Sequence, residues 1–347
     1  MMTKHQLPEF VGRLMRREDL SRAEAGHLLE ALLNGDASDA QIAAALVALK
    51  LKGETIDELA GLAEAMRQRA LRITSRHDVF IDTAGTGSSC VKTFNVSTAA
   101  AFVIAGAGLP VAKHGNRAAS SRCGSADVLG ALGVNVSISP EVSEQCLNEL
   151  GICFMFAPLY HTATARVAAI RRELGTQTTF NLLGPLTNPA RAPRQIIGVS
   201  SRDNLDRLAG ALALLGTEHA WVVHGADGLD EITVTDKTWV AEACNGEVRM
   251  FDVQPDDFGI ARTSLAKLAS GDAKENAAII RAVLTGARRD EARALVLVNA
   301  AAALVVGGIV ENLSEGMRRA EQSIDSGAAD MKLGELVRAT INKPPTA

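Results

Sequence analysis

Two adjacent carboxylates are the residues most able to do chemistry. Asp230 and Glu231 close the segment 224–231, HGADGLDE, which follows a short apolar run. Hard oxygen ligands of this kind suit Mg²⁺, which binds one or two carboxylates together with substrate oxygens and water. Asp and Gly are also ordinary turn residues, so this segment taken alone is more typical of a solvated turn than of a metal site.

A glycine-rich loop offers a partner for such a cation. The segment 82–98, DTAGTGSSCVKTFNVST, follows an apolar run and leads into a helix expected to begin near Ser97. Gly85 and Gly87 allow a tight turn, and the free amides at the start of a helix, with its positive dipole end, can face phosphate oxygens. The loop therefore predicts an anion-binding turn, with a plain strand-to-helix turn as the alternative.

This loop is neither of the two common nucleotide-binding motifs. A Walker A loop has glycine directly before Lys-Ser/Thr, whereas Val91 precedes Lys92 and Thr93 here. A dinucleotide-binding loop needs a third small residue and a carboxylate about twenty positions later. Cys90 stands at the third glycine and residues 105–115 contain no carboxylate, so both readings fail.

A third turn carries cations. Lys113, His114 and Arg117 lie in KHGNR at the end of another apolar run, and the small residues of 118–124, with Ser125 beyond them, follow. In open α/β sheets ligands collect at the carboxyl ends of the strands. The alternative is a solvated pair of cations beside a structural histidine, because structural pairs often mimic sites.

The elements that must position these turns divide at about residue 75. Residues 1–75 predict helices alone, with apolar residues at three- and four-residue spacing in 41–51 and 56–66. Three capping boxes precede the helical stretches: Ser21 with Glu24, Ser38 with Gln41, and Thr55 with Glu58. We expect a small helical domain, 1–75, followed by an α/β domain, 76–347.

After residue 76, short apolar runs alternate with helical stretches, which is typical of a largely parallel sheet covered by helices. From about residue 262 the pattern returns to helix. The expected strands are Val79–Thr83, Val111–His114, Val134–Ile138, Cys153–Phe156, Gln195–Val199 and Ala220–His224, with antiparallel additions at Ile232–Thr235, Thr238–Ala241 and Val248–Phe251.

Composition excludes several classes of protein. The chain has 347 residues, a net charge of −4 and 3% aromatic residues, which gives neither the basic stripe nor the stacking platforms of a nucleic-acid binder. Its five cysteines show no CxxC pair or metal-ligand spacing, and no secretory signal opens the sequence, so a cytoplasmic protein is expected. The apolar run 294–310, interrupted only by Asn299, is at the short limit for a membrane span and predicts a buried helix instead.

Read together, these segments resemble the anthranilate phosphoribosyltransferase family. The resemblance runs from the helical N-terminus into the last third of the chain, with the matching segments in the family's order. They are GTG (85–87), TFNVST (93–98), KHGNRAASS (113–121), FAPLYH (156–161), ELGTQTTFNLLGPLTNP (173–189) and GLDE (228–231).

The resemblance implies Mg-dependent transfer of a phosphoribosyl group from phosphoribosyl pyrophosphate to the amine of anthranilate. It implies Ser97, Asp230 and Glu231 as Mg²⁺ ligands, Gly85, Asn116 and Arg171 as anthranilate contacts, and Lys113, Arg171, Asp230 and Glu231 as the catalytic set. The donor-binding residues that it implies are Gly85, Gly87, Ser88, Ser89, Thr93, Asn95, Ser97, Thr98, Lys113, His114, Gly115, Asn116, Arg117, Ser120, Ser121 and Ser125.

The resemblance also implies an architecture and an assembly. The family's small helical domain includes a later helical excursion, expected here near residues 162–190, and its members commonly pair as homodimers through the helical part. Three arginines lie close together at 166, 171 and 172, and the family's spacing to ELG at 173–175 favours Arg171 for the acceptor. No general base is assigned, because an aniline nitrogen is uncharged near pH 7; His114 is a candidate orienting residue.

The chain departs from the family pattern at specific positions. Ser88-Ser89 and then Cys90 replace the usual Gly-Asp continuation of the first loop, and Gln177 stands where an arginine is common. Two alternatives follow: the same chemistry on a different aromatic amine, or a ligand-binding homologue without catalysis. A pyrimidine nucleoside phosphorylase shares the expected fold, but the KHGN segment disfavours it.

Overall fold

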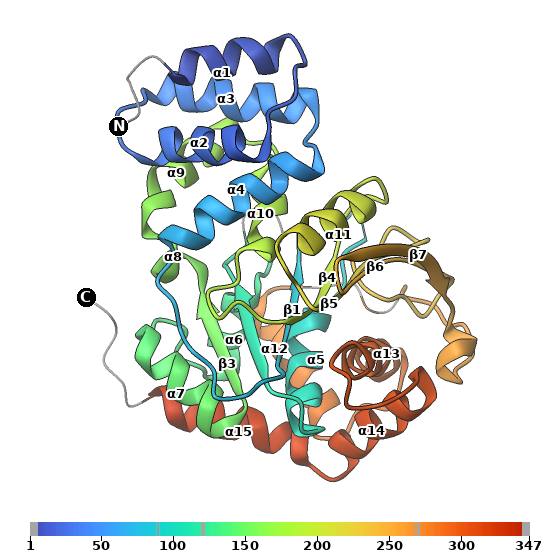
Figure 1. Cartoon of the computed structure of the whole chain (residues 1–347). Coiled ribbons are helices and arrows are strands. Elements are labelled where there is room, and N and C mark those ends of the chain that lie inside the picture. Colours follow the sequence, from blue (N-terminus) through green and yellow to red (C-terminus); the bar gives the residue numbers. More distant parts are fainter. Residues whose placement is uncertain are drawn as a thin grey trace.

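The chain has a helical part at one end and a larger α/β part at the other (Figure 1). The computed structural model describes residues 6–87, 89, 91–118, 122–266, 268 and 271–341. The helical part begins with α1 (Gln6–Met15), α2 (Arg22–Leu33), α3 (Asp39–Lys52) and α4 (Ile56–Arg69).

The three expected capping boxes start α2, α3 and α4. In each, the hydroxyl of Ser21, Ser38 or Thr55 accepts from the backbone N–H three residues later, and the side chain at that third position accepts from the capping residue's own N–H. Two of the otherwise unpaired amide groups of each helix start are thereby satisfied.

One capping carboxylate also holds the helices together. Besides its capping bond, Glu58 accepts from the backbone N–H of Leu20 at 2.8 Å and from Lys52 Nζ at 2.8 Å. Glu58 is fully buried, and the Lys52 side chain is 3% exposed. A charge buried this deeply depends on its partners, because water cannot replace them.

The α/β part contains a seven-stranded sheet. The strands run in the order β3-β2-β1-β4-β5-β6-β7, parallel from β3 to β5 and antiparallel from β5 to β7. They are β1 (Ile81–Gly85), β2 (Val111–Gly115), β3 (Ile152–Phe156), β4 (Arg194–Gly198), β5 (His219–Gly225), β6 (Thr238–Cys244) and β7 (Glu247–Val253).

Helices cover both faces of the sheet (Figure 1). Side chains alternate between the two faces, so Ile196 and Val223 join one apolar core whereas Ile197 and Val222 join the other. The flanking helices are α5 (Val96–Gly106), α6 (Ser125–Leu132), α7 (Pro140–Leu150), α11 (Asn204–Leu214), α12 (Ala273–Leu284), α13 (Glu291–Val306), α14 (Leu313–Asp325) and α15 (Ala328–Ile341). The core containing Ile197 continues through α11 into the helical part.

A helical excursion leaves the sheet after β3. It comprises α8 (Ala157–Tyr160), a short 3₁₀ turn (Thr162–Thr164), α9 (Ala165–Leu174) and α10 (Phe180–Leu186). Val167 and Ile170 of α9 share the core of the N-terminal helices. The fold class expected from the sequence is confirmed, and the division into 1–75 with this excursion and 76–347 remains our proposal for the domain limits.

Two expected strands are wrong. Residues 134–138 keep the alternating burial of a strand and residues 232–234 are all buried, but in both segments side chains bind backbone N–H groups in place of a neighbouring strand. Asn135 N donates to Thr340 Oγ1 at 3.2 Å, and Thr233 N donates to Thr238 Oγ1 at 3.0 Å. The first strand is also shifted, since β1 starts at Ile81 rather than at residue 79.

The apolar run at 294–310 forms most of α13, and its side chains up to Leu304 are buried apart from Ala294. The expected buried helix is therefore confirmed, with its end at Val306 and turns beyond. Within the described ranges, no helix has the length and apolarity to cross a membrane.

We predict that Glu58→Ala destabilises the protein by about 3 kcal/mol, because it removes a buried partner of Lys52 and leaves the Leu20 amide unpaired. Urea unfolding followed by circular dichroism measures the change. The matched control is Ser38→Ala, which removes an exposed capping box and should cost about 1 kcal/mol. Equal losses in the two variants would contradict a special role for the buried carboxylate.

Candidate active site

A cleft of about 390 Å³ lies where the carboxyl ends of β1 and β2 face the excursion helix α10. It brings together the three turns singled out in the sequence, which are up to 146 positions apart, from Gly85 to Glu231. The described donor-site residues that line it are Gly85, Gly87, Ser89, Thr93, Asn95, Ser97, Lys113, His114, Gly115, Asn116, Arg117 and Ser125, joined by Arg171, Asp230 and Glu231.

Some expected residues do not line this cleft. Thr98 is 1% exposed and faces the core, because it lies about 100° around α5 from Ser97. Its side chain therefore does not line the cleft, and its assignment to the donor site stays a prediction. Ser88, Ser120 and Ser121 lie outside the described residues, as does Cys90.

The first glycine loop is shaped by its neighbours. Thr86 N donates to Gly198 O at 2.9 Å, and Ser200 N donates to Thr86 Oγ1 at 3.3 Å, so the loop is tied to the end of β4. Gly87 has φ of +66°, a conformation that favours glycine. Asn95 precedes α5 without a side-chain cap, and Glu231 Oε1 accepts from the Ser97 N–H at this helix start instead.

The Lys113 side chain, on β2, connects β1 to the start of α5. It is 4% exposed, and its Nζ donates to Thr83 O and, at 3.2 Å, to Ser97 Oγ. Burial lowers the pKa of Lys113, and the carboxylates of Asp82 and Glu231 oppose that shift. Burial also raises the pKa of Asp82 to about 6, although the Lys113 charge opposes it.

The adjacent carboxylates form the acidic side of the cleft. Burial raises the pKa of Asp230, and burial together with the Asp230 charge raises the pKa of Glu231 to about 8. Glu231 Oε1 accepts from the backbone N–H of Ser97 at 3.2 Å, at the start of α5. Because two like charges repel each other in a half-buried site, the binding of a proton or a cation by this pair is favoured.

The oxygen ligands that these residues offer fit Mg²⁺. The available ligands are the two carboxylates and the hydroxyl of Ser97, all hard oxygens. Within the described ranges, no group of three or more His, Cys, Asp and Glu side chains could form a closed metal cage. The arrangement therefore suits an ion that takes its remaining ligands from a substrate and from water.

Arg171 forms the opposite, cationic side. Its Nη2 donates to Asn181 Oδ1 at 3.0 Å, and its guanidinium lies 5.4 Å from the centroid of the Phe180 ring. Among the described residues its buried Nε has no hydrogen-bond partner, and no carboxylate acts on its pKa. Burial lowers the pKa of Arg171, so an anion here would relieve an unfavourable burial.

The neighbouring arginines lie elsewhere. Arg166 pairs with Asp39 at 2.6 Å, and Arg172 is not among the residues that line the cleft. The family spacing therefore selected the arginine that reaches the cleft. Asn181 and Phe180, which orient it, lie in the family-like segment 173–189, and no local pattern marks either as a partner of Arg171.

Ser89 lines the cleft, and its hydroxyl is bound within the protein. Its hydroxyl donates to Gly228 O at 2.7 Å, and the residue is 4% exposed. It thus ties the first glycine loop to the loop that carries Asp230. An uncharged tie replaces the carboxylate that the family pattern places in this loop.

Lys92 is a cleft residue that the sequence analysis missed. It lines the cleft, is exposed, and its charge opposes the rise in the pKa of Asp230 that burial causes. The signal for it in the sequence is a cation inside a loop predicted to bind an anion.

The charge of Arg117 is paired within the protein. It pairs with Asp127 at 3.1 Å and lies 5.6 Å from the centroid of the Phe156 ring. Asp127 also accepts from the backbone N–H groups of Ala118 and Gly124, both at 2.9 Å. Arg117 therefore lines the cleft, but its charge is already paired with Asp127 of α6.

His114 is a neutral residue at this cleft. Burial lowers the pKa of His114 to about 3, and that of His161, whose ring centroid is 5.2 Å away, to about 4. Neither Nε2 has a hydrogen-bond partner among the described residues. A histidine with so low a pKa is a weak base near pH 7, which supports an orienting role for His114.

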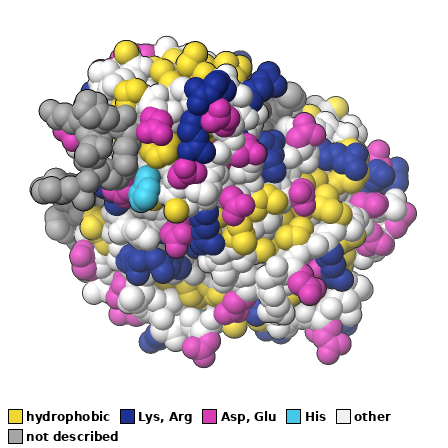
Figure 2. Space-filling view, turned by 45° about the horizontal axis from the view of Figure 1, so that its top comes forward, with side chains coloured by type: hydrophobic (Ala, Val, Ile, Leu, Met, Phe, Trp, Pro, Cys, Tyr) yellow, Lys and Arg dark blue, Asp and Glu magenta, His cyan; other side chains and the backbone are white. Residues whose placement is uncertain are grey.

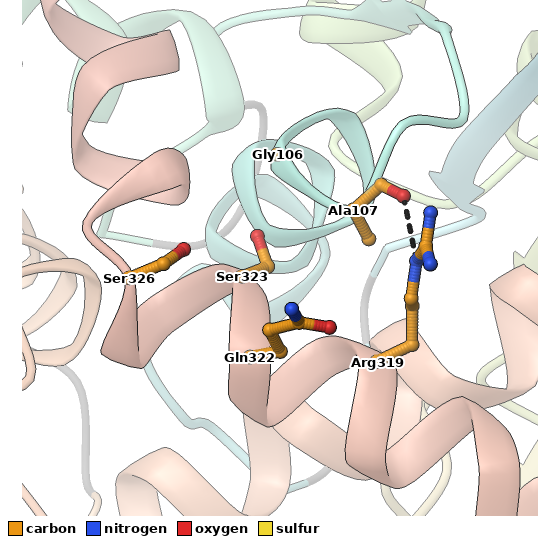
Figure 3. Close-up of a pocket in the computed structure, with 6 residues that line it drawn as sticks. All are labelled: Gly106, Ala107, Arg319, Gln322, Ser323 and Ser326. Atoms are coloured by element: carbon orange, nitrogen blue, oxygen red, sulfur yellow. Dashed lines mark hydrogen bonds between the residues drawn. The ribbon is translucent and has the colours of Figure 1, made fainter.

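A small hollow at the opposite end of α5 is the weaker candidate (Figure 3). It holds about 180 Å³ and is lined by Arg319, Gln322 and Ser323 of α14, among others. Arg319 Nε donates to Ala107 O at 3.1 Å, and Ser323 Oγ donates to Val103 O at 2.8 Å. Its main polar groups are therefore bound within the protein.

The buried histidines make a pH-dependent prediction. Because the folded pKa of His161 lies below the unfolded value of about 6.5, the unfolded chain binds more protons, and stability falls as pH drops from about 6.5 toward 4. Each such proton contributes about 1.4 kcal/mol per pH unit to the slope of the unfolding free energy against pH, and His161→Gln should remove the contribution of about one proton. Urea unfolding at pH 7 and pH 5 measures it, with exposed His27→Gln as the control. Identical slopes in wild type and His161→Gln would disprove the assignment.

Comparison with known proteins gives a consistent set of matches. A model of the helical bundle domain of the glycosyl transferase family matches residues 8–70, and a model of that family's a/b domain matches residues 77–330. The chain is 50% identical over 327 residues to the anthranilate phosphoribosyltransferase of Moorella thermoacetica, covering 94% of this chain and 96% of that relative. It is 53% identical over 330 residues to that of Anaeromyxobacter dehalogenans strain 2CP-C, covering 95% and 97%.

Solved structures agree. The anthranilate phosphoribosyltransferase of Thermus thermophilus superposes with a TM-score of 0.89 at 39% identity, covering 95% of this chain and 99% of that one. The enzyme of Saccharomyces cerevisiae in complex with PRPP and Mg also gives a TM-score of 0.89, at 29% identity, covering 97% and 98%.

Proposed function

The chain belongs to the anthranilate phosphoribosyltransferase family of glycosyltransferases, and we propose that it joins anthranilate to phosphoribosyl pyrophosphate (PRPP) with release of pyrophosphate. One observation carries the assignment: a single cleft contains both a glycine loop beside two carboxylates and a half-buried arginine without a carboxylate partner among the described residues. The glycine loop and the two carboxylates suit a Mg-bound pyrophosphate, and the arginine suits the carboxylate of the acceptor.

Donor binding uses the strand-end side of the cleft. Ser97, Asp230 and Glu231 would hold Mg²⁺, which supplies neutralising charge to the leaving pyrophosphate when bound. A yeast relative is described in complex with PRPP and Mg. Lys113 and the amides of the first glycine loop add positive potential, and Lys92 adds a further cation at the rim.

Acceptor binding uses the excursion side. Arg171 would meet the anthranilate carboxylate, with Asn181 and Phe180 fixing its guanidinium. Gly85 and Asn116 line the same cleft and complete the proposed acceptor contacts. A yeast relative is described in complex with 4-fluoroanthranilate.

The proposed reaction needs positioning more than a strong base. The amine nitrogen attacks the ribose C1 as the bond from C1 to pyrophosphate breaks, and the nitrogen then loses a proton. Because an aniline nitrogen is uncharged near pH 7, no residue has to deprotonate it first, which agrees with a neutral His114. Holding donor and acceptor in line in one cleft supplies the main rate gain.

We also propose a cytoplasmic homodimer that pairs through the helical part. α1 packs beside α3, and Met15, Val47 and Leu51 on these helices are 75%, 37% and 74% exposed. Val47 and Leu51 are four residues apart and share one face of α3. Figure 2 turns the helical end toward the viewer and shows hydrophobic side chains in patches on this face. A second copy would cover them.

The fluorescence of anthranilate tests the function. We predict that it disappears when the protein meets PRPP and Mg²⁺, and that chelating the metal stops the loss. Asp230→Asn with Glu231→Gln should lower turnover at least about a hundredfold, a few kcal/mol, because the metal ligands are removed. Exposed Asp206→Asn is the matched control.

Two results would count against the assignment. No loss of anthranilate across a wide range of PRPP concentrations would favour another aromatic amine or a non-catalytic homologue. Near wild-type turnover of the double variant at saturating Mg²⁺ would remove the carboxylates from the metal site.

We predict that Arg171→Ala raises the anthranilate KM about 10- to 100-fold, since a hydrogen bond to a charged group contributes about 1.5–3 kcal/mol. The KM for PRPP should change less than about threefold, because Arg171 is proposed to contact the acceptor and not the donor. Steady-state kinetics with each substrate varied gives both values. Arg172→Ala is the control, because Arg172 follows Arg171 in the sequence but does not line the cleft. A raised donor KM with an unchanged anthranilate KM would place Arg171 in the donor site.

A further inference from the structure

A buried asparagine holds the backbone next to the adjacent carboxylates. Asn299 is 4% exposed and lies in α13, where it interrupts an otherwise apolar buried face. Its Oδ1 accepts from Ile232 N at 2.9 Å, and its Nδ2 donates to Ile232 O at 2.9 Å. Nδ2 also donates to Leu295 O at 2.8 Å. The side-chain amide therefore pairs with both polar backbone groups of one residue.

That residue follows directly on Asp230 and Glu231. Ile232 is fully buried, and it belongs to a segment expected to be a strand that pairs with side chains instead. An apolar side chain at position 299 would leave the N–H and C=O of Ile232 without partners. Asparagine suits this place because one amide supplies a donor and an acceptor together.

Other contacts confine the same loop. A Cβ built on Gly198 would lie 1.7 Å from Asp230 O, so the end of β4 approaches the carboxylate loop more closely than a side chain allows. Ser97 N binds Glu231 Oε1, and Ser89 Oγ binds Gly228 O. These contacts hold the loop from the cleft side and from its beginning, whereas Asn299 holds its far end.

We propose that Asn299 is a positioning residue that keeps Asp230 and Glu231 close enough together to share one divalent cation. Two neighbouring carboxylates repel each other, and an unheld loop would separate them. Mg²⁺ tolerates little deviation from octahedral geometry, so a small displacement of either carboxylate weakens binding. The inference rests on the proposed function only in taking these carboxylates as the metal ligands.

The test measures metal binding directly. Mn²⁺ is titrated into the purified full-length protein and free Mn²⁺ is followed by electron paramagnetic resonance. Asn299→Leu should weaken Mn²⁺ binding at least about fivefold and raise the half-saturating Mg²⁺ of turnover by a similar factor, the tenfold-to-hundredfold range being usual for groups that orient ligands. The anthranilate KM should stay within about twofold of wild type, because Arg171 lies on the other side of the cleft.

Leu304→Ala is the matched control. Leu304 is a fully buried residue of the same helix, and its truncation lowers thermal stability without removing a hydrogen bond to the loop. It should leave Mn²⁺ binding unchanged. If Asn299→Leu does not fold, Asn299→Thr carries the test: its shorter side chain has one hydroxyl in place of the amide, cannot pair with both backbone groups of Ile232, and should bind Mn²⁺ more weakly than wild type.

Mn²⁺ affinity equal to wild type in the folded Asn299 variant, or equal weakening in Leu304→Ala, would overturn the inference. A wild-type protein that binds no Mn²⁺ would overturn it as well. Weakened Mn²⁺ binding in a protein that never consumes anthranilate would support the positioning role and reject the proposed function, so the two can fail separately.

Discussion

Lys113 carries a buried ammonium group at the point where β1, β2 and α5 meet. It donates to the backbone of Thr83 and to the hydroxyl of Ser97, and it lies in the field of Asp82 and Glu231. A charge with so little access to water has to be matched by groups on several elements. The glycine loop, the second strand and the carboxylate loop therefore share one electrostatic centre, and their relative positions follow from it.

The other side of the cleft is built by the helical excursion, and the N-terminal helices hold that excursion in place. Glu54, at the junction of α3 and α4, accepts from Thr179 Oγ1 at 2.6 Å and pairs with Arg207 of α11 at 3.5 Å. Thr179 directly precedes Phe180, which lies beside Arg171. A buried carboxylate of the helical part thus binds the segment that carries Phe180 on the acceptor side of the cleft.

The departure of this chain from its family's loop pattern has a structural account at Ser89. A hydroxyl that donates to Gly228 O joins the glycine loop to the carboxylate loop without adding another negative charge. Lys92, at the rim of the same cleft, adds positive potential near Asp230. Both features leave the cleft less acidic than a carboxylate at position 89 would make it, and both are compatible with a highly charged phosphate donor.

Local signals were readable from the sequence, whereas partners far apart in the chain were settled by the tertiary structure. The capping boxes at Ser21, Ser38 and Thr55 and the turn at Gly87 depend on residues within a few positions of each other, so their patterns predicted them. The patterns at 134–138 and 232–235 predicted burial correctly but not a strand, because Thr340, Thr238 and Asn299 bind the backbone groups that a neighbouring strand would need. The direction of the Ser89 hydroxyl and the pairing of Arg117 with Asp127 likewise depend on which loops the sheet brings together, and no local pattern records that.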